Sequence, residues 1–285
     1  MLYLTREEID RWLKEDVPYI DLTSWTLGIR EQQGSITYFT REEAVVCGTE
    51  EVRQIFDHLH IETDHIIPSG QQVKQGEVLI TGRGRAEDLH MAWKVGQNIL
   101  DHCSGIATKT RKMVDDAKSC NPKVAVLTTR KGFPGTKSLT TKSVMVGGAL
   151  PHRLGISETI LIFKQHMNMI GGFDVLLKKL PDLKGECCEK KIIVEAGSLE
   201  QAISLCQAGV DGIQFDKLKS EELKNAVKYL RAEFPHVVAL AAGGINEANV
   251  RDYAETGVDG IVTTSLFSAK PLDIGVKIEP LQIHL

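Results

Sequence analysis

Hydrophobic and polar positions change their period near the middle of the chain. Six short aliphatic runs in the second half are predicted strands. They are Val124–Leu127, Thr159–Ile162, Ile192–Val194, Gly212–Phe215, Val237–Ala241 and Gly260–Val262. Amphipathic helical stretches such as Leu199–Ala208 and Ser220–Phe234 separate them. Because the last four runs recur about every 20–25 residues, the length of one strand–helix unit, the pattern predicts a parallel sheet, open or closed into a barrel.

The first hundred residues have a more mixed pattern. The predicted strands are Ser35–Phe39, Ala44–Cys47, Asp64–Ile67 and Glu77–Thr81, and the predicted helices are Val52–His58 and Leu89–Met113. Gly82 and Gly84 are expected to interrupt the pattern after the last of these strands. Residues 1–16 predict an amphipathic helix, with Thr5 and Glu8 spaced as a capping box. This mixed order favours an α+β sandwich.

Composition narrows the class of protein. The 285 residues are 42% hydrophobic and 25% charged, which excludes a disordered chain, a collagen and a coiled coil. The net charge of -4 provides no bulk attraction to nucleic acid or to a membrane surface. We expect neither a signal peptide nor a membrane span, and the six cysteines contain no C-x-x-C pair. Reduced thiols in a cytoplasmic protein are therefore expected.

Polar residues follow the predicted strands at their carboxyl ends, where barrel enzymes place their active sites. Gly243 and Gly244 let backbone N–H groups approach a phosphate, and Asn246 is a candidate N-cap of the next helix. Thr263 and Thr264, after the next strand, can add donors to the same phosphate site. The alternative is an ordinary tight turn. No G-x-G-x-x-G follows a strand, which disfavours a dinucleotide-binding sheet.

Charged residues at the other strand ends suit a different part of the same ligand. Glu195 and Asp216 can hold Mg²⁺ or ribose hydroxyls, although both can instead cap the helices that follow. A basic loop and the segment after it could bind a carboxylate or a pyrophosphate. Their cations are Arg130, Lys131, Lys137, His152 and Arg153. The alternative is a basic loop whose charges face solvent. Together these residues favour a phosphorylated sugar diphosphate as ligand.

The motifs in this order resemble the quinolinate phosphoribosyltransferase family, also called nicotinate-nucleotide pyrophosphorylases. The resemblance covers nearly the whole chain. It rests on Glu15-Asp16, Asp21-Leu22-Thr23, Ser104-Gly105-Ile106-Ala107-Thr108, Thr129-Arg130-Lys131, Pro134-Gly135, Gly147-Gly148, His152-Arg153-Leu154-Gly155, Glu195, Asp216 and Gly243-Gly244-Ile245. It implies an N-terminal α/β sandwich, an incomplete C-terminal TIM-like α/β barrel, and a homodimer in which each sandwich covers the partner's barrel.

The resemblance also implies chemistry, namely displacement of pyrophosphate from 5-phosphoribosyl 1-pyrophosphate by a ring nitrogen, with Mg²⁺. It assigns acceptor contacts to Arg130, His152 and Arg153, donor contacts to Lys131, Glu195 and Asp216, and 5′-phosphate contacts to Gly243, Gly244 and Thr264. Lys131, Glu195 and Asp216 are the expected catalytic residues, and the two carboxylates are the expected metal ligands. The class of enzyme implied is a pentosyltransferase.

Three positions depart from the family pattern. His102 stands where relatives carry an arginine, Thr128 replaces an aspartate, and Phe163 replaces a lysine. Lys164 follows one residue later, but a shift of one residue on a strand points the side chain to the opposite face. With these changes the chain resembles the ModD branch, which is associated with molybdate transport. We therefore expect an acceptor other than quinolinate, lying near His102 and Phe163.

Three alternatives stay open: the carboxylating quinolinate reaction itself, another phosphate-binding barrel enzyme such as an isomerase or synthase, and a catalytically inactive ligand sensor. The motifs predict two domains, residues 1–104 with the tail 270–285 packed on them, and residues 105–269. About 165 residues at 20–25 per unit leave room for roughly seven strand–helix units, so the barrel is expected to be incomplete.

Overall fold

The computed structural model describes residues 5–281, and the chain divides into two compact units. The sandwich unit comprises Met1–Arg111, Phe133–Gly147 and Phe267–Leu285, and the barrel unit comprises Lys112–Gly132 and Gly148–Leu266. Residues 1–4 of the predicted first helix and 282–285 of the predicted tail lie outside the described residues. The predicted border at residues 104 and 105 falls inside one long helix, α4 (Ala86–Cys120).

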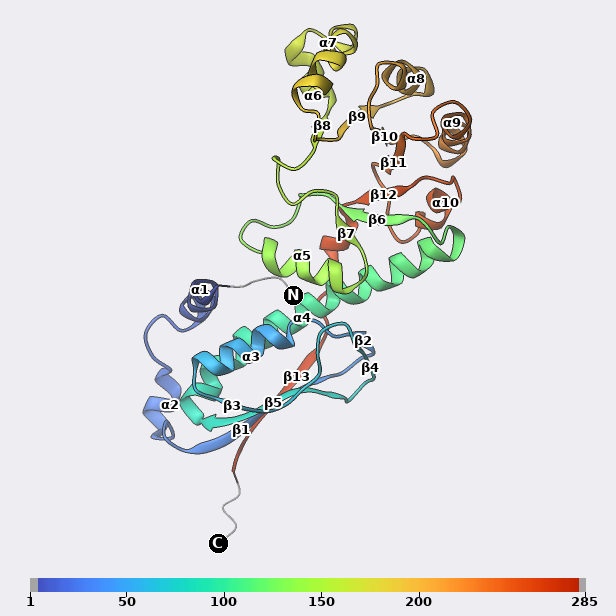
Figure 1. Cartoon of the computed structure of the whole chain (residues 1–285). Coiled ribbons are helices and arrows are strands. Elements are labelled where there is room, and N and C mark those ends of the chain that lie inside the picture. The colour runs from blue at the N-terminus through green and yellow to red at the C-terminus, as the bar shows by residue number, and fades with distance from the viewer. Residues whose placement is uncertain (1–4, 282–285) are drawn as a thin grey trace. The chain divides into compact units, whose positions relative to one another are not determined.

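The sandwich unit is built on an antiparallel sheet of strand order β13-β1-β5-β3 (Figure 1). Its elements are α1 (Arg6–Asp16), α2 (Leu22–Leu27), β1 (Gln33–Thr40), β2 (Ala44–Val45), α3 (Thr49–His58), β3 (Glu62–Ile66), β4 (Gln72–Val73), β5 (Val78–Arg85), the first part of α4, α5 (Lys137–Val146) and β13 (Ile274–Pro280). Buried side chains of β1, α3 and α4, among them Tyr38, Phe56 and Leu100, form one core. The α+β character expected for this part of the chain is therefore present.

Of the two local predictions made for this unit, the helix cap and the glycine break, one is confirmed and one is wrong. The capping box is confirmed, because the Thr5 side chain accepts from the Glu8 N–H and the Glu8 carboxylate accepts from the Thr5 N–H. The expected interruption at Gly82 and Gly84 is wrong, because both lie inside β5. A Cβ at Gly82 would lie 2.8 Å from both Ile61 and Phe56, so this glycine serves close packing rather than a turn.

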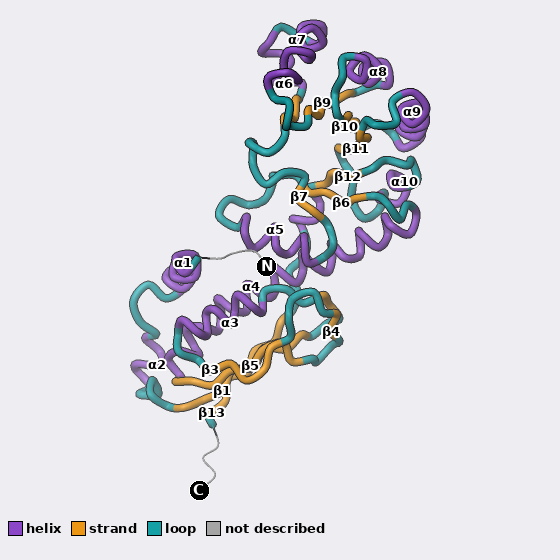
Figure 2. Tube along the Cα trace, viewed as in Figure 1, coloured by secondary structure: helices purple, strands orange, loops and turns teal. Residues whose placement is uncertain are grey.

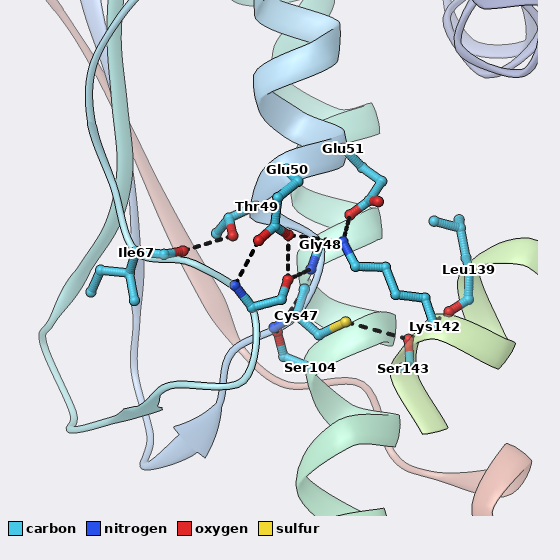
Figure 3. A network of polar contacts seen from close by, with 11 residues as sticks. Cys47, Gly48, Thr49, Glu50, Glu51, Ile67, Ser104, Leu139, Lys142 and Ser143 are labelled. Carbon is cyan, nitrogen blue, oxygen red and sulfur yellow. Dashed lines mark hydrogen bonds and ion pairs between the residues drawn. The ribbon is translucent and has the colours of Figure 1, made fainter. Parts of the chain in front are cut away.

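A buried polar cluster links α3 to α5 within the sandwich unit (Figure 3). The Lys142 ammonium donates to Glu50 at 2.8 Å and to Glu51 at 2.5 Å. Ser69 donates to Glu50 through its N–H and its hydroxyl. Burial acts to raise the pKa of Glu50, but the hydrogen bonds from Lys142 and Ser69 outweigh it and lower this pKa to about 2. The cluster is thus a paired ionic anchor for α5.

The barrel unit is an incomplete α/β barrel, as expected. Seven parallel strands run in the order β7-β6-β12-β11-β10-β9-β8, and α8, α9 and α10 follow the outer side of their arc (Figures 1 and 2). The elements are β6 (Ala125–Thr128), β7 (Leu150–Pro151), β8 (Ile160–Ile162), α6 (Lys164–Ile170), α7 (Phe173–Glu186), β9 (Ile192–Ala196), α8 (Leu199–Gln207), β10 (Gly212–Asp216), α9 (Ser220–Glu233), β11 (Val238–Ala242), α10 (Val250–Ala254) and β12 (Gly260–Thr263). The short 3-10 helix η1 (Ser265–Ser268) follows β12.

One face of this sheet carries a separate apolar cluster. Its buried members come from β8, β9, β11 and β12. The partly buried side chains of Leu127, Phe163 and Val238 pack against them. Strand pairing puts alternate residues of each strand on this inner face. At the carboxyl ends of β9 and β10 the side chains on this face are polar. Within residues 5–281, no helix is both long and apolar enough to cross a membrane.

Candidate active site

Two carboxylates lie at the carboxyl ends of adjacent strands on the inner face of the barrel unit. Glu195 is in β9 and pairs in register with Gln214 of β10, and Asp216 stands two residues after Gln214. Since side chains alternate along a strand, Glu195, Gln214 and Asp216 share one face. Ile193, two residues before Glu195, belongs to the inner apolar cluster, which identifies that face as the inner one.

The Glu195 carboxylate is half-buried, and its charged form is disfavoured. Burial raises the pKa of Glu195, and the charge of Asp216 raises it further. The N–H of Lys164, 3.5 Å from Glu195 Oε2, and the charges of Lys217 and Lys131 act in the opposite direction. Two neighbouring acids of this kind are suited to a cation, because a positive charge relieves both the burial and the repulsion.

The Gly243-Gly244 turn after β11 lies directly beside Asp216. Both glycines have positive φ, at 91° and 77°, a conformation that favours glycine. A Cβ at Gly243 would lie 2.8 Å from Asp216 Oδ1 and 2.5 Å from Lys217 Cγ. Lys217 itself has φ 60°, and its N–H donates to the Ala242 carbonyl at 2.8 Å. The glycine turn therefore fits closely around the end of β10.

The expectation that Asn246 caps the next helix is wrong. α10 begins at Val250 and has only five residues, and Asn246 Oδ1 instead accepts from the Ala248 N–H at 2.9 Å. The side chain thus stabilises a turn before the helix. A phosphate at this place would meet the glycine turn rather than a long helix dipole.

The threonines after β12 have different surroundings. Thr263 is buried and donates to the Ile245 carbonyl at 2.7 Å, so its hydroxyl holds the glycine turn from behind. Thr264 is half-buried, and its hydroxyl lies 2.8 Å from that of Thr129 after β6. Thr129 Oγ1 also accepts from the Lys131 N–H at 3.2 Å. The inner donors at this edge therefore come from Thr264 and Thr129.

The predicted cations divide between the two units. Arg130, Lys131, His152 and Arg153 belong to the barrel unit, whereas His102 on α4 and Lys137 at the start of α5 belong to the sandwich unit. Arg130 and Lys131 are exposed. Burial lowers the pKa of His152, and the charge of Arg153 lowers it further, so the imidazole is neutral near pH 7. Its Nε2 is buried and has no hydrogen-bond partner in the described part of the chain.

Phe163 directly follows β8, at the edge of the arc, and is the N-cap residue of α6. Its ring packs on the inner apolar cluster, and Lys164 is exposed. Lys164 is the first residue of α6, so the strand alternation used in the sequence argument does not extend to it. The Phe163 ring stacks on His166 with centroids 5.8 Å apart, and the Arg153 guanidinium lies 6.0 Å from the Phe163 centroid.

Three residues at this edge were not singled out from the sequence. Lys217 adopts a left-handed conformation that is uncommon outside glycine, and nothing in its sequence neighbourhood signals it. Gln214 is buried inside β10, and its Oε1 has no partner within the described residues. His166 lies in the first turn of α6, where its Nδ1 accepts from the Phe163 N–H.

Comparisons with known proteins agree over the whole chain. The family profile described as "Quinolinate phosphoribosyl transferase, N-terminal domain" matches residues 21–104, and the profile of the C-terminal domain matches residues 106–277. A Pasteurella multocida protein named "Putative pyrophosphorylase ModD" is 34% identical over 279 residues, covering 98% of this chain and 99% of that protein. The human nicotinate-nucleotide pyrophosphorylase (carboxylating) is 28% identical over 271 residues, covering 95% and 90%.

Solved structures of similar proteins share the fold. The crystal structure of nicotinate-nucleotide pyrophosphorylase from Ehrlichia chaffeensis superposes with a TM-score of 0.89 at 28% identity, covering 98% of this chain and 100% of that one. The similarity therefore extends through both units.

Proposed function

Because the chain belongs to the quinolinate phosphoribosyl transferase family, we propose that it transfers the phosphoribosyl group of 5-phosphoribosyl 1-pyrophosphate to a nitrogen heterocycle other than quinolinate. The observation that carries this proposal is the placement of Glu195 and Asp216 on one face, with Asp216 directly beside the Gly243 turn. That arrangement offers carboxylates for ribose or metal next to backbone donors for a phosphate.

The chemistry follows from the charges at the strand ends. As the bond from the anomeric carbon to pyrophosphate breaks, positive charge develops on the sugar ring. The Glu195 and Asp216 carboxylates stabilise that charge electrostatically, and the Gly243-Gly244 turn with Thr264 holds the 5′-phosphate. Lys131, exposed in the loop after β6, neutralises the departing pyrophosphate. The acceptor nitrogen then forms the new bond to the anomeric carbon, so one C–O bond is replaced by one C–N bond.

Mg²⁺ fits this donor set. No group of three or more His, Cys, Asp or Glu side chains within residues 5–281 could hold a metal by itself. Mg²⁺, however, is usually bound by one or two carboxylates together with substrate phosphates. Glu195 and Asp216 would hold it, and the ion would supply charge neutralisation for the pyrophosphate. Burial, and then the charge of Asp216, raise the pKa of Glu195, and a cation between the two carboxylates would relieve both effects.

We also propose a homodimer as the active form. The segment around α2 exposes large apolar side chains that contribute nothing to the core of the sandwich unit. Tyr19 is 92% exposed, Leu27 66% and Trp25 56%. Such a cluster is typical of a surface that a partner covers. Light scattering on the purified full chain should give twice the monomer mass, and Trp25→Ser with Leu27→Ser should reduce it.

The test of the function is release of pyrophosphate from the phosphoribosyl donor in the presence of Mg²⁺ and a panel of heterocycles. At least one heterocycle other than quinolinate should give turnover that Glu195→Gln reduces by about 10²-fold or more, the usual cost of losing a group that stabilises a transition state. Glu200→Gln is the matched control, since Glu200 is an exposed glutamate on α8.

The same assay separates the alternatives. Donor binding without pyrophosphate release for any heterocycle would make the protein a sensor. Turnover of quinolinate at least as efficient as that of the other heterocycles would make it a carboxylating pyrophosphorylase and would refute the proposed acceptor.

A further inference from the structure

An aromatic and cationic cluster lies at the open edge of the barrel unit. Strands β7 and β8 form the two ends of the seven-stranded sheet, so the sheet is not closed between them. Arg153 follows β7 and Phe163 follows β8, and the contact between the guanidinium and the ring joins the two ends. The ring is half-buried and packs on the inner cluster, which fixes its position.

The hydrogen bonding of this cluster fixes one donor. The Phe163 N–H donates to His166 Nδ1 at 3.0 Å, so Nδ1 is unprotonated. A neutral imidazole then carries its proton on Nε2, which is left to donate to a ligand. Because His166 stacks on Phe163 with ring planes 24° apart, that donor is held beside the phenyl ring.

The spacing of Arg153 and Phe163 suits a flat ligand. Their 6.0 Å separation is at the outer limit of a cation–π contact. A ring between them needs two van der Waals gaps of about 3.5 Å, or about 7 Å, which a side-chain shift of about 1 Å at Arg153 provides. An aromatic ring thus gains a phenyl face on one side and a guanidinium on the other.

Charge limits what such a ring can carry. Phe163 follows Ile162, which pairs with Val194, so its neighbour across the sheet is Glu195. The Lys164 N–H, 3.5 Å from Glu195 Oε2, confirms that these two strand ends are close. One anionic group can pair with Arg153. A second would face the phenyl ring, which offers no positive charge, or the Glu195 and Asp216 carboxylates, which repel it.

We propose that Phe163, Arg153 and His166 form the acceptor subsite, and that it selects a planar aromatic heterocycle with at most one carboxylate. This inference rests on the proposed function and adds the class of acceptor. Phe163 is the residue that sets the specificity, Arg153 pairs with the single carboxylate, and His166 donates through Nε2.

Equilibrium binding tests the proposal without requiring turnover. Calorimetry on the full chain, with the phosphoribosyl donor and EDTA present to prevent reaction, compares three probes: benzimidazole, pyridine-3-carboxylate and pyridine-2,3-dicarboxylate. The first two should bind at least tenfold more tightly than the dicarboxylate. Phe163→Leu should weaken both by about three- to tenfold, the value of a lost aromatic contact, and Phe163→Tyr should retain both within twofold.

Two further variants assign the roles. Arg153→Met should weaken pyridine-3-carboxylate more than benzimidazole, because only the former is an anion. Phe163→Lys should reverse the preference toward the dicarboxylate. Equal affinity for the three probes, no detectable binding of any, or no effect of Phe163→Leu would overturn the proposal. The predicted order of affinities without pyrophosphate release in any Mg²⁺ assay would count against the proposed function alone.

Discussion

Replacement of Lys142 by methionine should destabilise the protein strongly without touching the barrel unit. The Lys142 side chain is 9% exposed and pairs with Glu51, which is 2% exposed, and with Glu50, which is 15% exposed. Methionine fills a similar volume but leaves Glu51 as a buried carboxylate without its cation. Glu50 is less affected because it keeps both hydrogen bonds from Ser69.

The expected loss is about 3–5 kcal/mol of unfolding free energy, the usual cost of removing one partner of a buried ion pair. Urea unfolding at pH 7, followed by circular dichroism, measures it. Lys184→Met is the matched control, since Lys184 is 47% exposed and pairs with Asp211 at 2.8 Å. A surface pair of this kind contributes about 1 kcal/mol or less.

A second variant tests the cause of the loss. Lys142→Met combined with Glu51→Gln removes the orphaned charge and should recover part of the stability. The reasoning fails if Lys142→Met costs no more than Lys184→Met, or if the double variant is no more stable than Lys142→Met alone.

Three further predictions follow from other sites. Gly243→Ala should weaken binding of inorganic phosphate and the phosphoribosyl donor, measured by calorimetry, because its Cβ would lie 2.8 Å from Asp216 Oδ1 at a φ of 91°. Gly209→Ala is the comparison, because Gly209 has a similar φ of 90°, its Cβ would meet nothing within 4 Å, and it lies outside the proposed phosphate site. Gly105→Ala on α4 should lower the thermal midpoint, because its Cβ would overlap the Lys270 carbonyl oxygen, whereas Gly185→Ala, which meets nothing within 4 Å, should not. The pKa of Glu50 is lowered from 4.5 to about 2, so its charged form contributes stability that is fully present above pH 4.5 and is lost as pH falls toward 2. The difference in unfolding free energy between the native chain and Glu50→Gln, measured by urea titration, should therefore narrow over that window. A constant difference would contradict this.

Periodicity predicted the elements that matter for the site, because it depends on each residue's own neighbours. The strands β9, β10, β11 and β12 were predicted within one or two residues of their observed bounds. The shared face of Glu195 and Asp216 also follows from the two-residue repeat of a strand, given the pairing of β9 with β10. The capping box at Thr5 depends on three consecutive positions only.

Positions that depend on distant segments could not be predicted in this way. Gly82 was interpreted as a break, but it is a glycine because Ile61 and Phe56 pack against it. The tail strand β13 was not predicted as a strand, since it is stabilised by antiparallel pairing with β1, more than two hundred residues away in the sequence. The hydrogen bond from the Thr263 hydroxyl to the Ile245 carbonyl likewise joins segments that are far apart in the sequence.

The sequence by itself determined the sequence of strands and helices, the family, and which side chains follow each strand, because these depend on local spacing and residue type. Tertiary structure decided which of those side chains meet. Arg153 lies over Phe163 only because the open edge of the sheet brings the ends of β7 and β8 together, and Lys142 pairs with Glu50 and Glu51 only because α5 packs beside α3. Such contacts depend on how distant segments of the chain pack against one another, which no local pattern of residues encodes.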